Sequence, residues 1–320
     1  MTSYSISDAV FFATSHDKQS GHFKRLALVY VVAKLILLAL FMLIALPLIG
    51  PVLESLPTID LENANDITAL TTQYSLLSNA QSLSGILFFP IFLSVTASFL
   101  TWAIKDEWSP SRFGLKFGQT EMNLFVVYLA LFGMFFVAFL VMMIPMVIII
   151  SVLSFSSGDT ASAGMIVLVI LAAFAFIAAL IWFGVRLSLA LAMTVREDRI
   201  VIFESFAATK GHFWKLFGSY LLLYVIAILA SIVLMFVILL VAAPFVGAGF
   251  SMFDGMPQVS DYGKIFSLAF IPMLIALILA TLLEYWLYMA GNGITAYFLR
   301  WKDGDPAQAL ADVFGPEDEA

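Results

Sequence analysis

Six runs of apolar residues, each long enough to cross a lipid bilayer, alternate with polar segments along the chain. A helix needs about 20 predominantly apolar residues to span the hydrocarbon core. The pattern therefore predicts six transmembrane helices, over residues 26–49, 83–104, 124–153, 165–195, 216–246 and 265–290. An even number of spans places both ends of the chain on the same side of the membrane.

Composition supports this class. Apolar residues make up 62% of the chain and charged residues only 12%, against about half and a quarter in ordinary globular proteins. The sequence therefore predicts an all-α integral membrane protein. Residues 1–302 form its transmembrane domain, and residues 303–320 form an acidic tail on the same side as the N-terminus.

The distribution of basic residues predicts the orientation of the chain in the membrane. Cytoplasmic segments of membrane proteins carry an excess of lysine and arginine. One set of segments holds Lys18, Lys24, Arg25, Lys105, Arg112, Lys116, Arg196, Arg199, Lys210, Lys215, Arg300 and Lys302, whereas the opposite loops hold Lys264. Both termini are therefore expected on the cytoplasmic side.

The spans group into three outgoing and returning pairs, which predicts three helical hairpins. The outgoing spans open alike, with Tyr30, Tyr128 and Tyr220 at matching positions. The returning spans close alike, with a basic and then an acidic residue at 105–106, 196–197 and 302–303. Two interpretations stay open: an internal threefold repeat, or the shared need of every inner helix end for basic and interfacial aromatic residues.

Three cytoplasmic segments, residues 5–14, 199–210 and 294–301, are expected to be helices lying in the membrane interface. One face of the second segment is apolar and the other polar, with Ile202, Phe203 and Phe206 on the first and Glu204, Ser205 and Thr209 on the second. The residues of this connection predicted to meet the membrane surface form what we call the collar: Phe203, Phe206, Lys210, His212 and Lys215. The collar either recognises anionic lipid or a soluble partner, or simply anchors the connection.

Charged side chains inside spans are costly, which makes them candidates for function. The chain has three: Lys34, Arg186 and Glu284. Glu284 would reach the depth of the two basic residues if the last helix broke at residues 291–293, whose sequence is Gly-Asn-Gly. We therefore expect a break there and a cluster of the three charges. This cluster is either a structural ion pair or a site for an anionic ligand such as a lipid headgroup.

No catalytic residue, metal site or cofactor is expected. The chain has no cysteine, and it contains no phosphate-binding loop, His-Glu-x-x-His or Gly-x-Ser-x-Gly motif. Its three histidines are too loosely spaced to predict a metal site. A net charge of −7 argues against nucleic acid as a partner.

The segment from Val185 to Phe217 carries a family resemblance. Val185–Ala192, Phe203–Phe206, Thr209–Gly211, Phe213-Trp214 and Leu216-Phe217 resemble the signature of a family of uncharacterised bacterial six-span membrane proteins. That family is similar to the membrane domain of some glycerophosphodiester phosphodiesterases. The resemblance implies a bacterial inner membrane, but it carries over no catalytic residue, because no soluble phosphodiesterase domain is expected after residue 302.

Two functional hypotheses follow. The first is a non-catalytic membrane component that organises lipid or a partner at the cytoplasmic face, with membrane lipids, including anionic ones, and a soluble cytoplasmic protein as candidate partners. The second is a transporter or flippase that moves a small amphiphile or lipid by means of the Lys34, Arg186 and Glu284 cluster.

Overall fold

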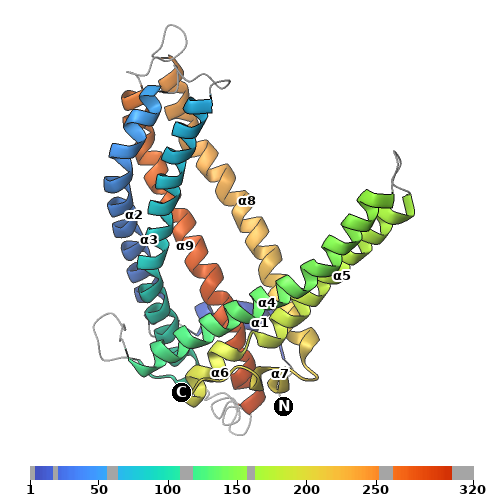
Figure 1. Cartoon of the computed structure of the whole chain (residues 1–320). Helices are drawn as coiled ribbons and strands as arrows, with labels where there is room; N and C mark the ends of the chain where they lie inside the picture. The colour runs from blue at the N-terminus through green and yellow to red at the C-terminus, as the bar shows by residue number, and fades with distance from the viewer. Residues whose placement is uncertain are drawn as a thin grey trace, which may run out of the picture.

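The computed structural model describes residues 4–16, 21–55, 64–108, 118–156, 163–251 and 262–304, and every regular element in these ranges is a helix (Figure 1). The helices are α1 (Ile6–Ser15), α2 (His22–Ser55), α3 (Ala64–Lys105), α4 (Gln119–Ser156), α5 (Ala163–Leu187), α6 (Ala190–Glu197), α7 (Glu204–Ala208), α8 (Phe213–Ser251) and α9 (Tyr262–Asp303). Of the acidic tail predicted over residues 303–320, Asp303 is the last residue of α9, and residues 305–320 lie outside the described residues. The all-helical class is confirmed, with six helical stretches long and apolar enough to cross a membrane.

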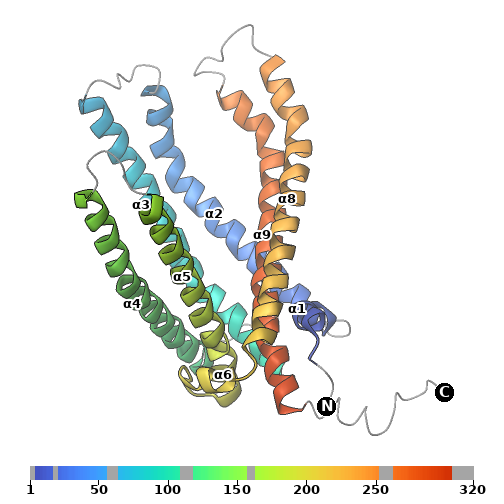
Figure 2. The same cartoon turned by 90° about the vertical axis from the view of Figure 1, so that its right-hand side faces the viewer.

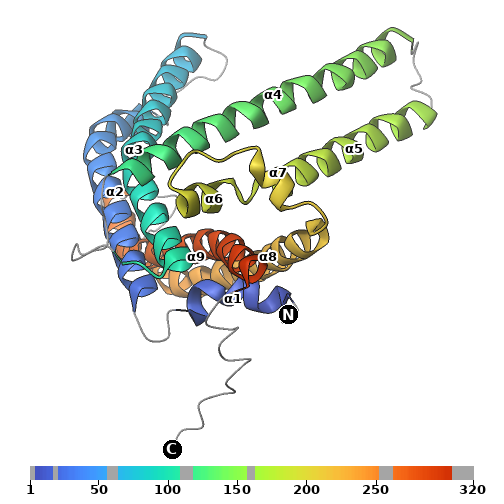
Figure 3. The ribbon, with the colours of Figure 1, turned by 90° about the horizontal axis from the view of Figure 1, so that it is seen from below.

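Consecutive long helices lie side by side as α2 with α3, α4 with α5, and α8 with α9 (Figures 1 and 2). The three pairs converge at one end of the molecule, where α1, α6 and α7 lie. We call this the basal end. Away from it, the α4 and α5 pair diverges from the other two (Figure 3). Tyr4 and Trp301, near the two described ends of the chain, have ring centroids 5.3 Å apart there.

The buried core occupies the basal part of the bundle. Helix α9 packs against α1, α2, α3, α6 and α8, and most of its buried residues lie between Tyr285 and Leu299, in its basal part. The largest fully buried side chains are Tyr30, Tyr285, Phe99, Phe298, Leu26, Leu100, Leu124, Leu187, Leu189, Leu216, Met289 and Ile294.

The diverging parts of the helices instead expose large apolar side chains. Phe132 of α4, Phe174 of α5 and Leu240 of α8 are 71%, 66% and 74% exposed. A water-soluble monomer rarely carries so large an apolar surface. In a bilayer these side chains meet lipid tails, and the helical backbone bonds itself internally as the hydrocarbon requires.

Helix α1 is docked on α8 and α9. Ser5 caps it as expected, because its hydroxyl accepts a hydrogen bond from the Asp8 amide at 3.3 Å. Ala9, Val10 and Ala13 are buried. Small residues allow the closest approach: a Cβ added to Gly293 would lie 3.3 Å from the Ala13 backbone nitrogen. Residues 5–14 therefore include a packed helix, with Phe11 of its opposite face 44% exposed.

The predicted break at residues 291–293 is wrong. Helix α9 runs without interruption from Tyr262 to Asp303, so residues 294–301 do not form a separate segment. Asn292 supports the helix by donating a hydrogen bond to the Tyr288 carbonyl at 3.0 Å. Gly293 is small because α1 crosses there, and its flexibility is not used to end the helix.

A break occurs instead in the span predicted over residues 165–195. Helix α5 ends at Leu187, two turn residues follow, and α6 begins at Ala190. The Ser188 hydroxyl donates to the Val185 carbonyl at 2.9 Å, and the Ser205 hydroxyl of α7 donates to the Arg186 carbonyl at 2.5 Å. These hydroxyls satisfy carbonyls at the end of α5. The helix expected over 199–210 is likewise shorter, and only α7 is helical.

Candidate functional site

Two of the three intramembrane charges form an ion pair. Lys34 of α2 binds a carboxylate oxygen of Glu284 in α9. The Tyr30 hydroxyl donates to the other oxygen at 2.9 Å. Glu284 reaches α2 without a break in α9, because the basal part of α9 runs past the beginning of α2, where the Tyr285 hydroxyl donates to the Phe23 carbonyl. Two members of the expected cluster, Lys34 and Glu284, are thus brought together, although the break in α9 on which that expectation rested does not occur.

Arg186 does not join this pair. Its Nη1 donates to the Thr209 hydroxyl at 3.3 Å and to the Phe206 carbonyl at 3.4 Å, and its guanidinium carbon lies 5.6 Å from the centre of the Trp182 ring. The expectation of a three-charge cluster is therefore wrong. The reason is topological: α2 packs on α9, whereas α5 packs on α4, α7 and α8.

Two polar residues of the α7 segment are not where the sequence pattern placed them. Ser205 and Thr209, expected on the polar outer face, are fully buried, whereas Phe203, expected to meet the membrane surface, is 70% exposed. Both hydroxyls turn inward because they bond Arg186, at its carbonyl and its guanidinium. The Phe206 side chain packs against α5, with its ring centroid 5.8 Å from that of Phe183.

The remaining collar residues divide into engaged and exposed ones. Lys215 lies over the Trp301 ring at 4.0 Å, and the His212 ring lies edge-on to the same ring at 5.4 Å. Lys210 is exposed. The collar residues do not form one surface, because His212 and Lys215 hold α8 to the end of α9.

The basal end is tied together by ion pairs. Arg300 donates to both carboxylate oxygens of Asp106, at 2.7 and 3.2 Å, and His16 Nε2 lies 3.0 Å from the same group. Lys105 binds Asp198 at 2.6 Å. Asp106 and Asp198 both have a positive φ and follow the last turns of α3 and α6. The basic and acidic residues that close the returning spans thus pair between segments.

Asp106 is the group of the basal end from which we expect a pH dependence of stability. Burial acts to raise the pKa of Asp106, but hydrogen bonds and charge from Arg300 and His16 outweigh it, so that the pKa lies below its usual 3.8. A carboxyl whose pKa is lower in the folded state stabilises above its unfolded pKa, and the contribution is lost as the pH falls through the folded value. The side chain is 55% exposed, so we expect this carboxylate to contribute at most about 1 kcal/mol to the free energy of unfolding.

Thermal unfolding measured between about pH 5 and about pH 2 should show Asp106→Asn losing less stability on acidification than the parent. Parallel acid sensitivity of the two proteins would contradict this.

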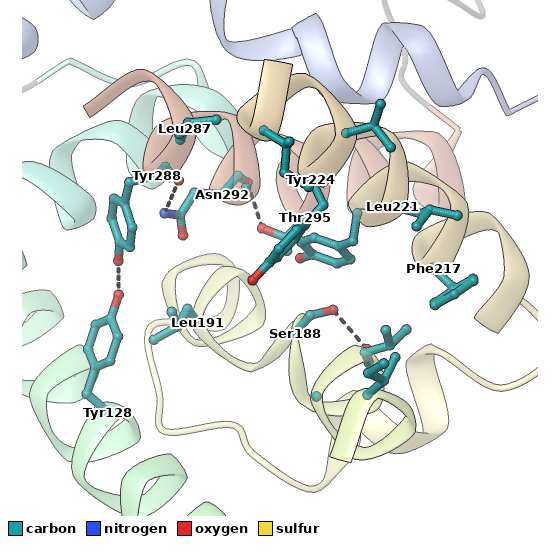
Figure 4. A pocket seen from close by; sticks show the side chains of 17 residues that line it. Tyr128, Ser188, Leu191, Phe217, Leu221, Tyr224, Leu287, Tyr288, Asn292 and Thr295 are labelled. Atoms are coloured by element: carbon teal, nitrogen blue, oxygen red, sulfur yellow. Dashed lines mark hydrogen bonds between the residues drawn. The ribbon is translucent and has the colours of Figure 1, made fainter. Parts of the chain in front are cut away.

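A cavity of about 820 Å³ lies in the basal part of the bundle, between α5 and α8, with α4, α6 and α9 completing its wall (Figure 4). Its volume is typical of a small-molecule site. The wall is mainly apolar, with Ile181, Val185, Leu191, Phe217, Leu221, Val225, Ile228 and Leu287 among its residues. None of the predicted site residues lines it.

Four tyrosines stand in the same wall: Tyr128, Tyr220, Tyr224 and Tyr288. The hydroxyls of Tyr128 and Tyr288 bond each other across α4 and α9 (Figure 4). The sequence contained a signal for this site, because Tyr128 and Tyr220 occupy the matching positions at which the outgoing spans open. That pattern was attributed to the membrane interface, whereas these two side chains face the cavity.

Comparison with known proteins adds no relative. No protein-family model matches the chain, and neither a curated protein nor a solved structure matches it. The family resemblance of residues 185–217 therefore stays a prediction.

Proposed function

We propose that this protein is a non-catalytic, multi-pass membrane component that holds a lipid of the inner leaflet in the cavity between α5 and α8. The main support for this proposal is the depth range that the cavity covers. Its lining runs along α8 from Phe217 to Ile228, which at 1.5 Å per residue corresponds to about 6 to about 22 Å from the beginning of the helix. That range covers the depth of one leaflet.

The cavity is accessible from the membrane side. Several of its wall residues are also among the exposed apolar or aromatic ones of α5 and α8, namely Ile181, Leu221, Tyr224, Val225 and Ile228. A lipid chain could therefore enter laterally between the two helices. In the described part of the chain, the lining residues include no carboxylate, imidazole or amine, which supports binding over catalysis.

In this proposal both termini and the basal end face the cytoplasm of a bacterial inner membrane, and three helical hairpins cross it. The excess of basic residues in the basal segments supports the orientation. Phe203 and Trp214, 70% and 76% exposed, would sit at the membrane surface beside the cavity, as aromatic residues commonly do. A soluble partner at the basal end would be the other component that the protein organises.

The transport hypothesis receives less support. It needs Lys34, Arg186 and Glu284 as one site, but Lys34 and Glu284 neutralise each other between α2 and α9. Arg186 is bonded to α7. None of the three lines the cavity.

Filling the cavity mouth tests the proposal. Val225 lines the cavity, whereas Ile232 does not; the two are 46% and 45% exposed and lie seven residues apart, on the same face of α8. We expect Val225→Trp to reduce lipid retained per purified protein, measured by native mass spectrometry, about tenfold. Ile232→Trp should retain lipid as the parent does.

The result can contradict the proposal in two ways. Equal retention by both variants would mean that the cavity is not where lipid is held. Purification of the parent without lipid, but with a soluble protein, would favour organisation of a partner over lipid binding.

A further inference from the structure

The polar groups of the cavity wall are all uncharged. Among the 17 lining residues of the described chain, none is aspartate, glutamate, lysine, arginine or histidine. The polar ones offer only hydroxyl and amide groups: Tyr128, Ser188, Tyr220, Tyr224, Tyr288, Asn292 and Thr295. A ligand charge placed among them would be desolvated without an opposite charge, which is costly.

The nearest candidate counter-charge is directed elsewhere. Arg186 is the charged residue of α5, and it follows the lining residues Gly184 and Val185. Its guanidinium, however, contacts Trp182, Phe206 and Thr209, which do not line the cavity. Through these contacts Arg186 holds the α7 segment outside the lining of the cavity; its Nε is buried and has no hydrogen-bond partner in the described part of the chain.

Most polar groups of the wall are already satisfied within the protein. The Asn292 amide donates to the Tyr288 carbonyl at 3.0 Å, and the Thr295 hydroxyl donates to the Asn292 carbonyl at 2.7 Å (Figure 4). Ser188 bonds the Val185 carbonyl. These donors are bonded within the protein and do not need a ligand as an acceptor.

Tyr224 is different. It lines the cavity and is 72% exposed, and no hydrogen bond joins its hydroxyl to the described part of the chain. It lies eleven residues beyond Phe213, the first residue of α8, or about 16 Å along the helix. Side chains of a helix lean toward its N-terminus, which brings the Tyr224 hydroxyl closer to the basal end. Within the hydrocarbon region an unpaired hydroxyl is unfavourable. Its position at the cavity mouth lets it bond a polar group of a bound lipid.

We infer that the lipid held in the cavity ends in an uncharged, hydroxyl-bearing group, as a diacylglycerol does, and that Tyr224 bonds this group. The inference rests on the proposed lipid-binding function and names its ligand class. A hydroxyl and ester oxygens can enter the neutral wall and pair with the phenol. A phosphate would bring a charge to a place that offers none of opposite sign. The apolar wall then accommodates the acyl chains.

A matched pair of lipids tests the inference. Dioleoylglycerol and dioleoyl phosphatidic acid have the same chains and differ by the phosphate. Each would carry a photoreactive group on one acyl chain, and trace amounts would be added to phosphatidylcholine vesicles containing the full-length protein. Cross-links would be mapped by mass spectrometry to peptides of α5 and α8. We expect cavity residues to be labelled about tenfold more by dioleoylglycerol.

The Tyr224→Phe variant removes only the hydroxyl. It should lower labelling by dioleoylglycerol about fivefold, as loss of one hydrogen bond predicts, and leave labelling by phosphatidic acid unchanged. Equal or greater labelling by phosphatidic acid would overturn the inference while leaving lipid binding intact, and so would a Tyr224→Phe variant that labels as the parent does. If neither lipid labels the cavity, the proposed function fails together with the inference.

Discussion

Replacing Glu284 with leucine is expected to lower the free energy of unfolding by about 3 kcal/mol. The Glu284 carboxylate pairs with the Lys34 ammonium and accepts a hydrogen bond from the Tyr30 hydroxyl. Its removal leaves this cation and this buried hydroxyl without an acceptor. Tyr30 is 2% exposed and cannot turn to the solvent. Reversible unfolding of the protein in mixed micelles, followed by circular dichroism as a denaturing detergent is added, would measure the loss.

The double variant Lys34→Met with Glu284→Leu separates the pair from its packing. The Lys34 and Glu284 side chains are 33% and 50% exposed, so in a bilayer the loss of one partner leaves a charge facing lipid, whereas replacing both by apolar residues leaves none. We therefore expect the double variant to recover about 2 kcal/mol of the loss. If it is as unstable as Glu284→Leu alone, the ion pair contributes nothing and α9 packing explains the effect.

That Glu284 would pair with a basic residue could be expected from the sequence, since a charge inside a span needs a partner and the chain offers few. The break in α9 that this expectation used is absent, and the place of Arg186 could not be predicted. Its depth matched that of Lys34, but which helices are neighbours depends on tertiary packing, and α5 packs away from α2 and α9. The sequence predicts the depth of a residue along its helix, but whether residues of equal depth touch depends on the lateral positions of their helices in the bundle.

The two helix irregularities show a related limit. Glycines at 291 and 293 suggested flexibility, but Gly293 serves a helix crossing with Ala13. The break in the other span arises at Ser188 and Leu189, where serine hydroxyls of two segments take over the carbonyl bonds. A glycine that permits a bend and a glycine that permits close packing look alike until the neighbouring helix is known.

The cavity was missed for a similar reason. Its wall draws on α4, α5, α6, α8 and α9, and every residue in it has an ordinary role in a membrane helix when taken alone. The all-helical class and the six spans followed from local hydrophobicity. The cavity depends on how far α5 stands from α8, which no local pattern encodes.

Replacing Gly293 with leucine is expected to release α1 from the bundle. A Cβ at this position would already lie 3.3 Å from both the Cβ and the backbone nitrogen of Ala13, and the leucine side chain has no space beyond it. Overpacking of about 2 kcal/mol would raise the open population roughly thirtyfold. Because the chain has no cysteine, a single Val10→Cys substitution reports the release. Val10 is fully buried against the bundle, so maleimide should label it slowly in the parent and roughly thirtyfold faster beside Gly293→Leu.

Gly133→Leu provides the matched control for this release. Gly133 also lies inside a long helix, but a Cβ there would meet nothing within 4 Å, so the same substitution should leave Val10→Cys protected. Fast labelling in the control as well would mean that α1 opens through general loosening of the bundle. Slow labelling in both would mean that the crossing of α1 over α9 tolerates a large side chain, and that Gly293 is not what allows α1 to dock. If α1 is released while lipid retention is unchanged, the docking of α1 and the cavity between α5 and α8 are independent features of the basal end.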